Sequence, residues 1–169
     1  YGLPFAIRTD NGPPFASVGA GGLSLLSVWW VKLGIMPERI KPGHPEQNGR
    51  HERLHLTLKQ EVMNRPAASP QAQQERCDSF LPIYNKLRPH EALGQVPPAS
   101  RYVPSPRLYP EQLGDIEYPP LTEVRRVRSN GQIKWRGELV FVSEALVGEL
   151  VGITEDKNGW LVSFGPIPL

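Results

Sequence analysis

The sequence has one cysteine and no long hydrophobic run, and both scarcities limit what the protein can be. Cys77 has no second cysteine with which to form an internal disulfide, which fits a reducing cytoplasm. The longest apolar stretch, residues 23–35, is interrupted by polar, charged and glycine residues and falls short of the roughly 20 residues that span a bilayer. No positively charged segment precedes an apolar one at the start, so no secretory signal is visible. These absences predict a cytoplasmic protein with no membrane partner.

A strong net charge is also lacking, because 19 basic and 17 acidic residues leave a formal charge of +2. The average charge therefore favours nucleic-acid binding only weakly. The distribution is more informative, since basic residues concentrate in residues 50–59 and again in residues 125–136. Solvated faces of ordinary elements would give the same pattern. The length of 169 residues suits one ordinary domain or two small ones, and a 39% hydrophobic fraction is typical of a globular protein.

The first half of the chain has the periodicity of a mixed α/β domain. The pattern predicts strands at residues 3–9 and 36–40 and helices at residues 23–33, 46–63 and 69–87. In the helix over residues 46–63, Leu54, Leu58 and Val62 recur every four positions and predict a buried stripe. Ser69 and Pro70 suit the N-cap and first position of the helix that follows.

Proline sets off the second half of the chain. Residues 88–120 are rich in proline and predict a linker or extended arm. After residue 121 the pattern becomes β, and Trp135 and Trp160 are expected in its core. Short strands separated by glycine turns, as in a small barrel, are predicted at residues 123–128, 132–135, 138–142, 149–154 and 160–164. We therefore predict a first domain over residues 1–90, a linker over residues 91–120 and a small barrel over residues 121–169.

Two carboxylates stand in short motifs on different predicted elements. Asp10 follows the first strand, and Glu52 lies in the longest helix with 41 residues between the two. At 100° per residue, Glu52 and Lys59 share one face of that helix. Hard oxygen ligands from two elements are what a Mg²⁺-dependent phosphoryl-transfer site needs, and a third carboxylate would normally complete it.

The motifs around these carboxylates resemble those of a known family. Residues 8–12 (RTDNG) with Phe15 resemble the second-carboxylate motif of DDE transposases and retroviral-type integrases. Residues 42–53 (PGHPEQNGRHER) resemble the third-carboxylate motif. Residues 84–93 (YNKLRPHEAL) resemble the signature that follows the catalytic core. Bacterial insertion-sequence transposases are the most similar, and the resemblance covers about residues 3–102.

The resemblance implies an α/β RNase H-like core, here partial with two strands and three helices, followed by a small all-β SH3-like barrel. It implies that Asp10 and Glu52 are catalytic and, with an earlier aspartate, hold two Mg²⁺ or Mn²⁺ ions for cleavage and joining of DNA strands. The implied partners are transposon ends and target DNA, with a homo-oligomer in the full-length protein, and the implied place is the bacterial nucleoid. The residues expected at the DNA are Asn48, Arg50, Arg53, Lys59, Arg126, Arg128 and Lys134.

The chain departs from the family pattern where the first catalytic aspartate belongs. That aspartate lies on a strand before Asp10 in the family, and neither Asp78 nor Asp115 can replace it because both follow Glu52. The chain also begins at Tyr1 rather than methionine. We therefore expect a fragment of a longer protein, truncated and inactive in strand transfer, with an exposed sheet edge.

Other interpretations stay open. His44, His51 and His55 could suggest zinc, but histidines spaced by four without further ligands are usually incidental. The arginines of the predicted barrel fit either a DNA backbone or a solvated face. A non-catalytic DNA-binding or transpososome-assembly module is therefore the alternative to an enzyme, and a plain protein-interaction barrel is a more remote one.

Overall fold

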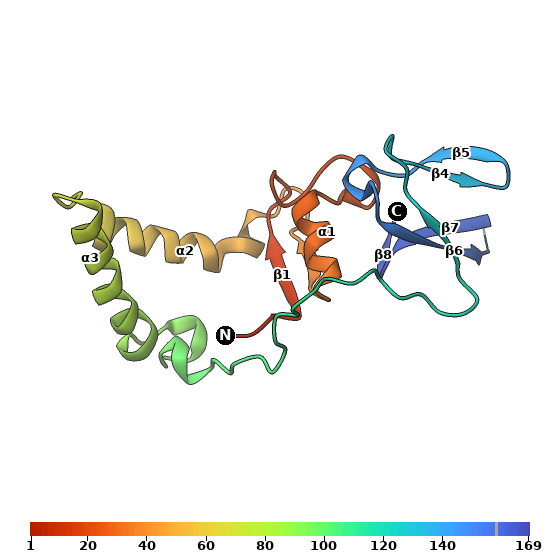
Figure 1. Ribbon diagram of the computed structural model, residues 1–169. Coiled ribbons are helices and arrows are strands. Elements are labelled where there is room, and N and C mark those ends of the chain that lie inside the picture. The colour runs from red at the N-terminus through yellow and green to blue at the C-terminus, as the bar shows by residue number, and fades with distance from the viewer. Residues whose placement is uncertain (158) are drawn as a thin grey trace. The chain divides into compact units, whose positions relative to one another are not determined.

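The computed structural model describes residues 1–157 and 159–169, which pack as two compact units. One unit contains residues 2–45 and 106–169, and the other contains residue 1 and residues 46–105. Figure 1 shows the elements along the chain. Its helices are α1 (Leu25–Lys32), α2 (Gly49–Leu58) and α3 (Pro70–Pro82), and its strands are β1 (Ala6–Thr9), β2 (Met36–Arg39), β3 (Glu123–Arg126), β4 (Gln132–Trp135), β5 (Glu138–Phe141), β6 (Leu150–Asp156), β7 (Gly159–Phe164) and β8 (Ile167–Pro168). No helix in the described part of the chain has the length and apolar character to cross a membrane.

Strands β1 and β2 are a parallel pair joined through α1. Ala6 pairs with Met36, and the register continues to the end of both strands. α1 begins at a reciprocal cap, in which the Ser24 and Ser27 side chains each accept a hydrogen bond from the other residue's backbone N–H. The helix stops before Gly34, whose φ of 68° lies in the left-handed region that favours glycine. The strand–helix–strand order predicted from the sequence is confirmed.

The C-terminal strands form two antiparallel sheets. One has the order β3-β6-β7-β8, and the other is the β4–β5 hairpin. Arg136 and Gly137 make the hairpin turn, both with positive φ, as a two-residue turn requires. All five predicted strands are confirmed, but the pairing does not close them into a barrel among the described residues. The SH3-like barrel is therefore not confirmed.

The core of this unit is built on both faces of α1. Val28 and Val31 pack with buried residues of the C-terminal sheets, including Phe164 and Ile153. From another side of the helix, Trp30 packs in a second cluster with residues near β1 and β2. The helix that follows β1 thus shares its core with strands more than 100 residues away.

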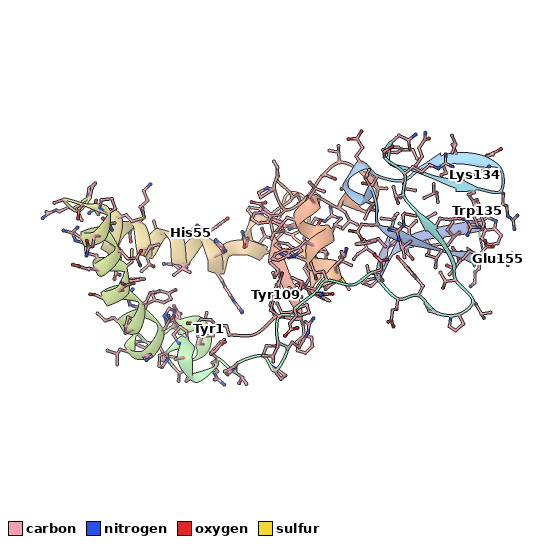
Figure 2. All side chains as sticks on the ribbon, in the orientation of Figure 1. Tyr1, His55, Tyr109, Lys134, Trp135 and Glu155 are labelled. Atoms are coloured by element: carbon pink, nitrogen blue, oxygen red, sulfur yellow. The ribbon has the colours of Figure 1, made fainter. Side chains whose placement is uncertain are left out.

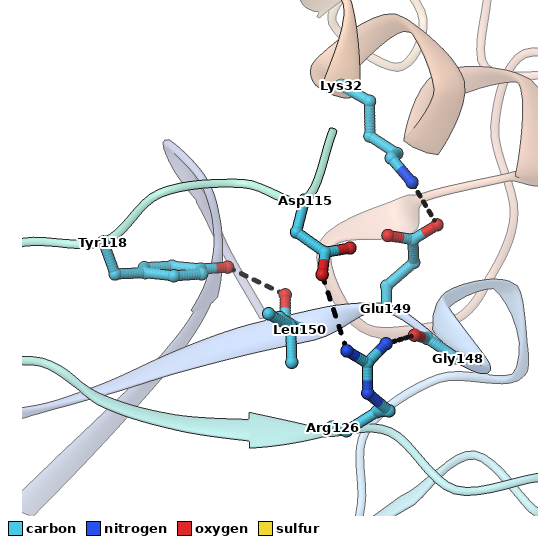
Figure 3. A network of polar contacts seen from close by, with 7 residues as sticks. All are labelled: Lys32, Asp115, Tyr118, Arg126, Gly148, Glu149 and Leu150. Atoms are coloured by element: carbon cyan, nitrogen blue, oxygen red, sulfur yellow. Dashed lines mark hydrogen bonds and ion pairs between the residues drawn. The ribbon is translucent and has the colours of Figure 1, made fainter. Parts of the chain in front are cut away.

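Polar contacts strengthen the link between α1 and the sheet (Figure 3). Lys32, in the last turn of α1, forms an ion pair with Glu149, with 2.9 Å between Nζ and Oε1. Both side chains are more than four-fifths buried. Nearby, the Tyr118 hydroxyl donates to the backbone carbonyls of Leu150 and Ser163, and burial raises the pKa of this phenol. The proline-rich arm is therefore fastened to the sheet by Tyr118.

The second unit is helical and has little core. α2 continues through a π-helical turn at Lys59–Met63, and α3 continues through another at Ile83–Leu87. Ser69 caps α3 and Pro70 begins it, as predicted. The predicted leucine stripe of α2 is wrong as a buried core, because α2 has no buried residue and only Val62 of the stripe is buried. In this unit the buried apolar side chains are Val62 and Phe80.

The two units divide the chain at other points than those predicted from the sequence. Packing places residues 2–45 with the C-terminal strands, and residues 91–105 with the helices α2 and α3. The division into residues 1–90, 91–120 and 121–169 stays a prediction about domains rather than a description of packing.

Candidate functional site

Asp10 lies just after β1, where the chain turns toward the loop before α1. The Gly12 N–H donates to its Oδ1 at 3.0 Å, which is the bond of an Asx turn. The Asn11 side-chain amide donates to the Ile40 carbonyl and joins this loop to the end of β2. Asp10 is exposed. One of its carboxylate oxygens thus orders the turn, and the carboxylate faces solvent.

Glu52 lies in the first turn of α2. It is exposed, and within the described part of the chain it has no hydrogen bond or ion pair. Asn48 is at the N-cap, yet its side chain makes no capping bond. A carboxylate near a helix N-terminus is favoured by the helix dipole, but no contact with a protein cation explains Glu52. Its side chain is available for an external ligand.

The predicted residues of α2 fall on two different faces. By helical periodicity Asn48, Glu52 and Lys59 share one side, with Lys59 at the start of the π-helical turn. Arg50 and Arg53 instead line a cleft of about 540 Å³ against the segment after α3. The five side chains expected at the DNA or metal therefore do not form one patch.

The cleft beside Arg50 and Arg53 includes residues that sequence reasoning did not select as a site. Tyr84, His90 and Leu93 of the third motif line it. The rings of Tyr84 and His90 meet edge to face at 4.7 Å between centroids. The His90 Nε2 atom is buried with no hydrogen-bond partner. The motif itself was the available signal, and the structure shows that its side chains gather on one cleft.

Arg88 of the same motif has a structural role. Its guanidinium donates to Glu61 at 2.7 Å and lies over the Tyr84 ring at 5.8 Å. The hydrogen bond lowers the pKa of Glu61 and raises the pKa of Arg88. This pair joins the π-helical turn after α2 to the end of the π-helical turn after α3.

The three basic residues predicted on the C-terminal strands differ in their surroundings. Arg126 donates to the Gly148 carbonyl and faces Asp115 at 3.5 Å (Figure 3). Arg128 and Lys134 are exposed and have no ion pair within the described residues. Figure 2 shows Lys134 beside Trp135 on the β4–β5 hairpin. The free cations are thus Arg128 and Lys134, among the described residues of this set.

A cluster of aromatic and basic side chains on these strands was also missed. Trp135 and Trp160 meet at 5.2 Å between centroids, and the Arg136 guanidinium lies 4.3 Å from the Trp160 centroid. Arg125 lies over Trp135 at 5.3 Å. Trp160 is 40% exposed. The expectation that both tryptophans are core residues is wrong, because strand alternation does not tell which face of a sheet is covered.

The structure describes Asp10 and Glu52 in separate units. No three histidine, cysteine, aspartate or glutamate side chains gather to hold a metal ion in residues 1–157 and 159–169. Each carboxylate is therefore characterised by its own surroundings, as an exposed oxygen ligand on an ordered element.

Comparison with known proteins assigns a family to the middle of the chain. The family model described as integrase core domain matches residues 33–98. An uncharacterized 39.2 kDa protein of insertion element IS476 from Xanthomonas euvesicatoria is 34% identical over 99 residues, which are 58% of this chain and 27% of that protein. An uncharacterized 31.7 kDa protein of insertion element IS407 from Burkholderia multivorans is 30% identical over 99 residues, 58% of this chain and 34% of that protein.

The chain spans about a third or less of the length of these relatives. The matched residues 33–98 include Glu52 with its flanking motif and the motif of residues 84–93. An integrase core domain implies an RNase H-like fold, DNA as the partner and a general use of divalent metal ions. Through residues 33–98, the chain belongs to the integrase core family of transposases and integrases.

Proposed function

We propose that the protein acts in DNA transposition or integration, as part of a transposase that cleaves and joins DNA strands by metal-dependent phosphoryl transfer. The observation that supports this most strongly is Glu52. It is exposed, it lacks a protein partner among the described residues, and it lies in the segment that matches the integrase core. Packing or salt-bridge formation gives no reason for a carboxylate at that position.

Asp10 and Glu52 each supply oxygen ligands of the kind that Mg²⁺ or Mn²⁺ prefers. Both carboxylates are exposed, and Asp10 uses only Oδ1 in its turn, so the donor set fits such an ion. The chemistry that a bound ion supplies is Lewis-acid stabilisation of charge on the phosphodiester and activation of the attacking hydroxyl. A further carboxylate would complete the set, and we expect this chain alone to lack strand-transfer activity.

Basic side chains of α2 are proposed to position the DNA backbone. Lys59 lies on the same helical face as Glu52, two turns later, where a phosphate bound near the carboxylate would meet its ammonium group. Arg50 and Arg53 line the other face, and no ion pair occupies them in the described residues. Arginine and lysine at such exposed positions contribute sequence-independent affinity.

A transposition assay in cells tests the proposed role of Glu52. The reading frame that encodes this chain would be supplied as wild type, Glu52→Gln, Asp10→Asn and, as a matched control, Glu75→Gln on α3. We expect the first two substitutions to abolish transposition and the control to retain it. Transposition by Glu52→Gln at the control's level would contradict the proposal.

The alternative function, a non-catalytic DNA-binding or assembly module, is favoured by the exposed cations Arg128 and Lys134. Because the C-terminal strands share their core with α1, the whole chain is the appropriate protein for a binding measurement. Lys134→Ala is expected to lower the dependence of log K on log salt by about one phosphate contact. DNA binding that ignores salt would count against this function.

A further inference from the structure

Two histidines on α2 direct their ring nitrogens toward each other. His51 and His55 lie one helical turn apart, and their Nε2 atoms are 2.9 Å apart. The rings meet edge to face, with 4.1 Å between centroids. Both residues are exposed, and Figure 2 shows His55 on α2. The sequence gives only the spacing of four, whereas the structure adds the convergence of the two nitrogens.

The two nitrogens need to move little to share a metal ion. Zinc binds imidazole nitrogen at about 2.0–2.1 Å, so tetrahedral geometry places two such nitrogens about 3.3 Å apart. The Nε2 atoms of His51 and His55 would separate by about 0.4 Å to reach this distance. Helical zinc sites obtain two of their ligands from histidines with this same spacing. The side-chain conformations are therefore close to those that a metal ion requires.

The surroundings leave the other coordination positions open. No third histidine, cysteine, aspartate or glutamate joins the pair in the described residues, so water completes the coordination. Glu52 is adjacent to His51, and Lys59 follows His55 by one turn, so the nearest charges are of opposite sign. Imidazole nitrogen suits zinc, nickel and copper, whereas Mg²⁺ prefers oxygen ligands.

We propose that His51 and His55 form a two-nitrogen site for a divalent transition-metal ion of the class of Zn²⁺, Ni²⁺ and Cu²⁺. The site is separate from the oxygen ligands proposed for Mg²⁺, and the inference does not rest on transposase activity. Only the helical state brings both nitrogens to one point. A bound ion therefore stabilises α2, a helix without a buried residue of its own.

Calorimetric titration of the untagged chain at neutral pH tests the site. We expect one equivalent of Cu²⁺, Ni²⁺ or Zn²⁺ to bind at the histidine pair, with Cu²⁺ the tightest, and no binding of Mg²⁺ at this pair. Far-ultraviolet circular dichroism recorded along the same titrations should show an increase in helical content. Hydrogen exchange of the α2 amides should slow on addition of Zn²⁺.

Matched variants separate this site from adventitious binding. His51→Gln and His55→Gln should each weaken binding by at least about tenfold, because the second ligand acts intramolecularly, and His44→Gln should leave it unchanged. A double variant, His55→Gln with Leu56→His, keeps two histidines on α2 but spaces them by five. All these positions are exposed, so folding is preserved. Equal affinity in a single variant or in the double variant would overturn the proposal.

Discussion

The two units of the protein differ in how they are held together. In the unit of residues 2–45 and 106–169, α1 and the C-terminal strands surround a continuous apolar core, with Leu146, Val151 and Phe164 fully buried. In the unit of residues 46–105, α2 buries no residue, and Val62 and Phe80 are the buried apolar side chains. Polar contacts replace the core there, since the Gln73 amide bonds to both Ala67 and Val62.

This difference indicates a division of labour. A helix without a core stays ordered through caps, local hydrogen bonds and ligands, and it lies at the low-stability end of a folded chain. Such a helix can present Glu52, His51 and His55 to external ligands. The well-packed unit instead fixes the turn that carries Asp10, because β1 and β2 are anchored on the same core as the C-terminal strands.

The largest expected effect is loss of the core that α1 shares with the sheets. Phe164→Ala should lower the free energy of unfolding by about 3–5 kcal/mol, since a fully buried ring is lost. Phe80→Ala is the matched substitution in the helical unit and should cost clearly less, because few buried side chains surround it. Urea denaturation followed by circular dichroism measures both values. Equal losses would remove the distinction between the units.

Crowding at Gly152 gives the next largest effect. A Cβ at this position would lie 2.5 Å from ring carbons of Tyr118 and 2.8 Å from Thr122. Gly152→Ala should therefore displace Tyr118 from the sheet and cost about 1–3 kcal/mol. Thermal unfolding of the single variant and of Gly152→Ala with Tyr118→Ala tests the cause. The second alanine should make the first one tolerable; strictly additive losses would show that another contact is responsible.

The ion pair between α1 and the sheet should contribute less. Glu149→Gln leaves Lys32 partly buried without its partner, and a loss of about 1–3 kcal/mol is expected. Glu38→Gln breaks the exposed pair between Arg8 and Glu38 and serves as the control, with an expected cost of about 0–1 kcal/mol. Chemical denaturation should rank the two in that order, and the reverse order would deny Lys32 a role in the core.

The smallest expected effect is a pH dependence from Tyr118. Burial raises the pKa of its phenol above the ordinary value of 10.0, so the unfolded chain releases this proton at a lower pH than the folded chain. The contribution to stability is complete below about pH 10 and is lost as the pH rises toward the higher folded pKa. Denaturation at alkaline pH should show this slope, and Tyr118→Phe should flatten it. An identical slope in both proteins would refute the assignment.

Local signals in the sequence predicted most elements of the fold. Ser69 with Pro70 marked the start of α3, and glycine turns marked the β4–β5 hairpin, because caps and turns depend on neighbouring residues. The sharing of α1 between β1–β2 and the C-terminal strands was not predictable, since it joins residues more than 100 positions apart. Exposure of Trp160 escaped for the same reason.

The candidate site was predicted in part. Motifs located Asp10 and Glu52, and their roles stay predictions. Helical periodicity placed Lys59 beside Glu52, but the basic composition of α2 did not reveal that Arg50 and Arg53 belong to another face. The contact of Arg126 with Asp115 and Gly148 was also invisible, because it depends on how the proline-rich arm crosses the sheet.

Hydrogen exchange of the backbone amides tests the central contrast most directly. The account predicts slow exchange in α1, β6 and β7, fast exchange in α2 and α3, and no change in either group on Glu52→Gln, because Glu52 makes no protein contact among the described residues. Amides of α2 as protected as those of α1 in the isolated chain would contradict it, and so would loss of α2 protection in Glu52→Gln.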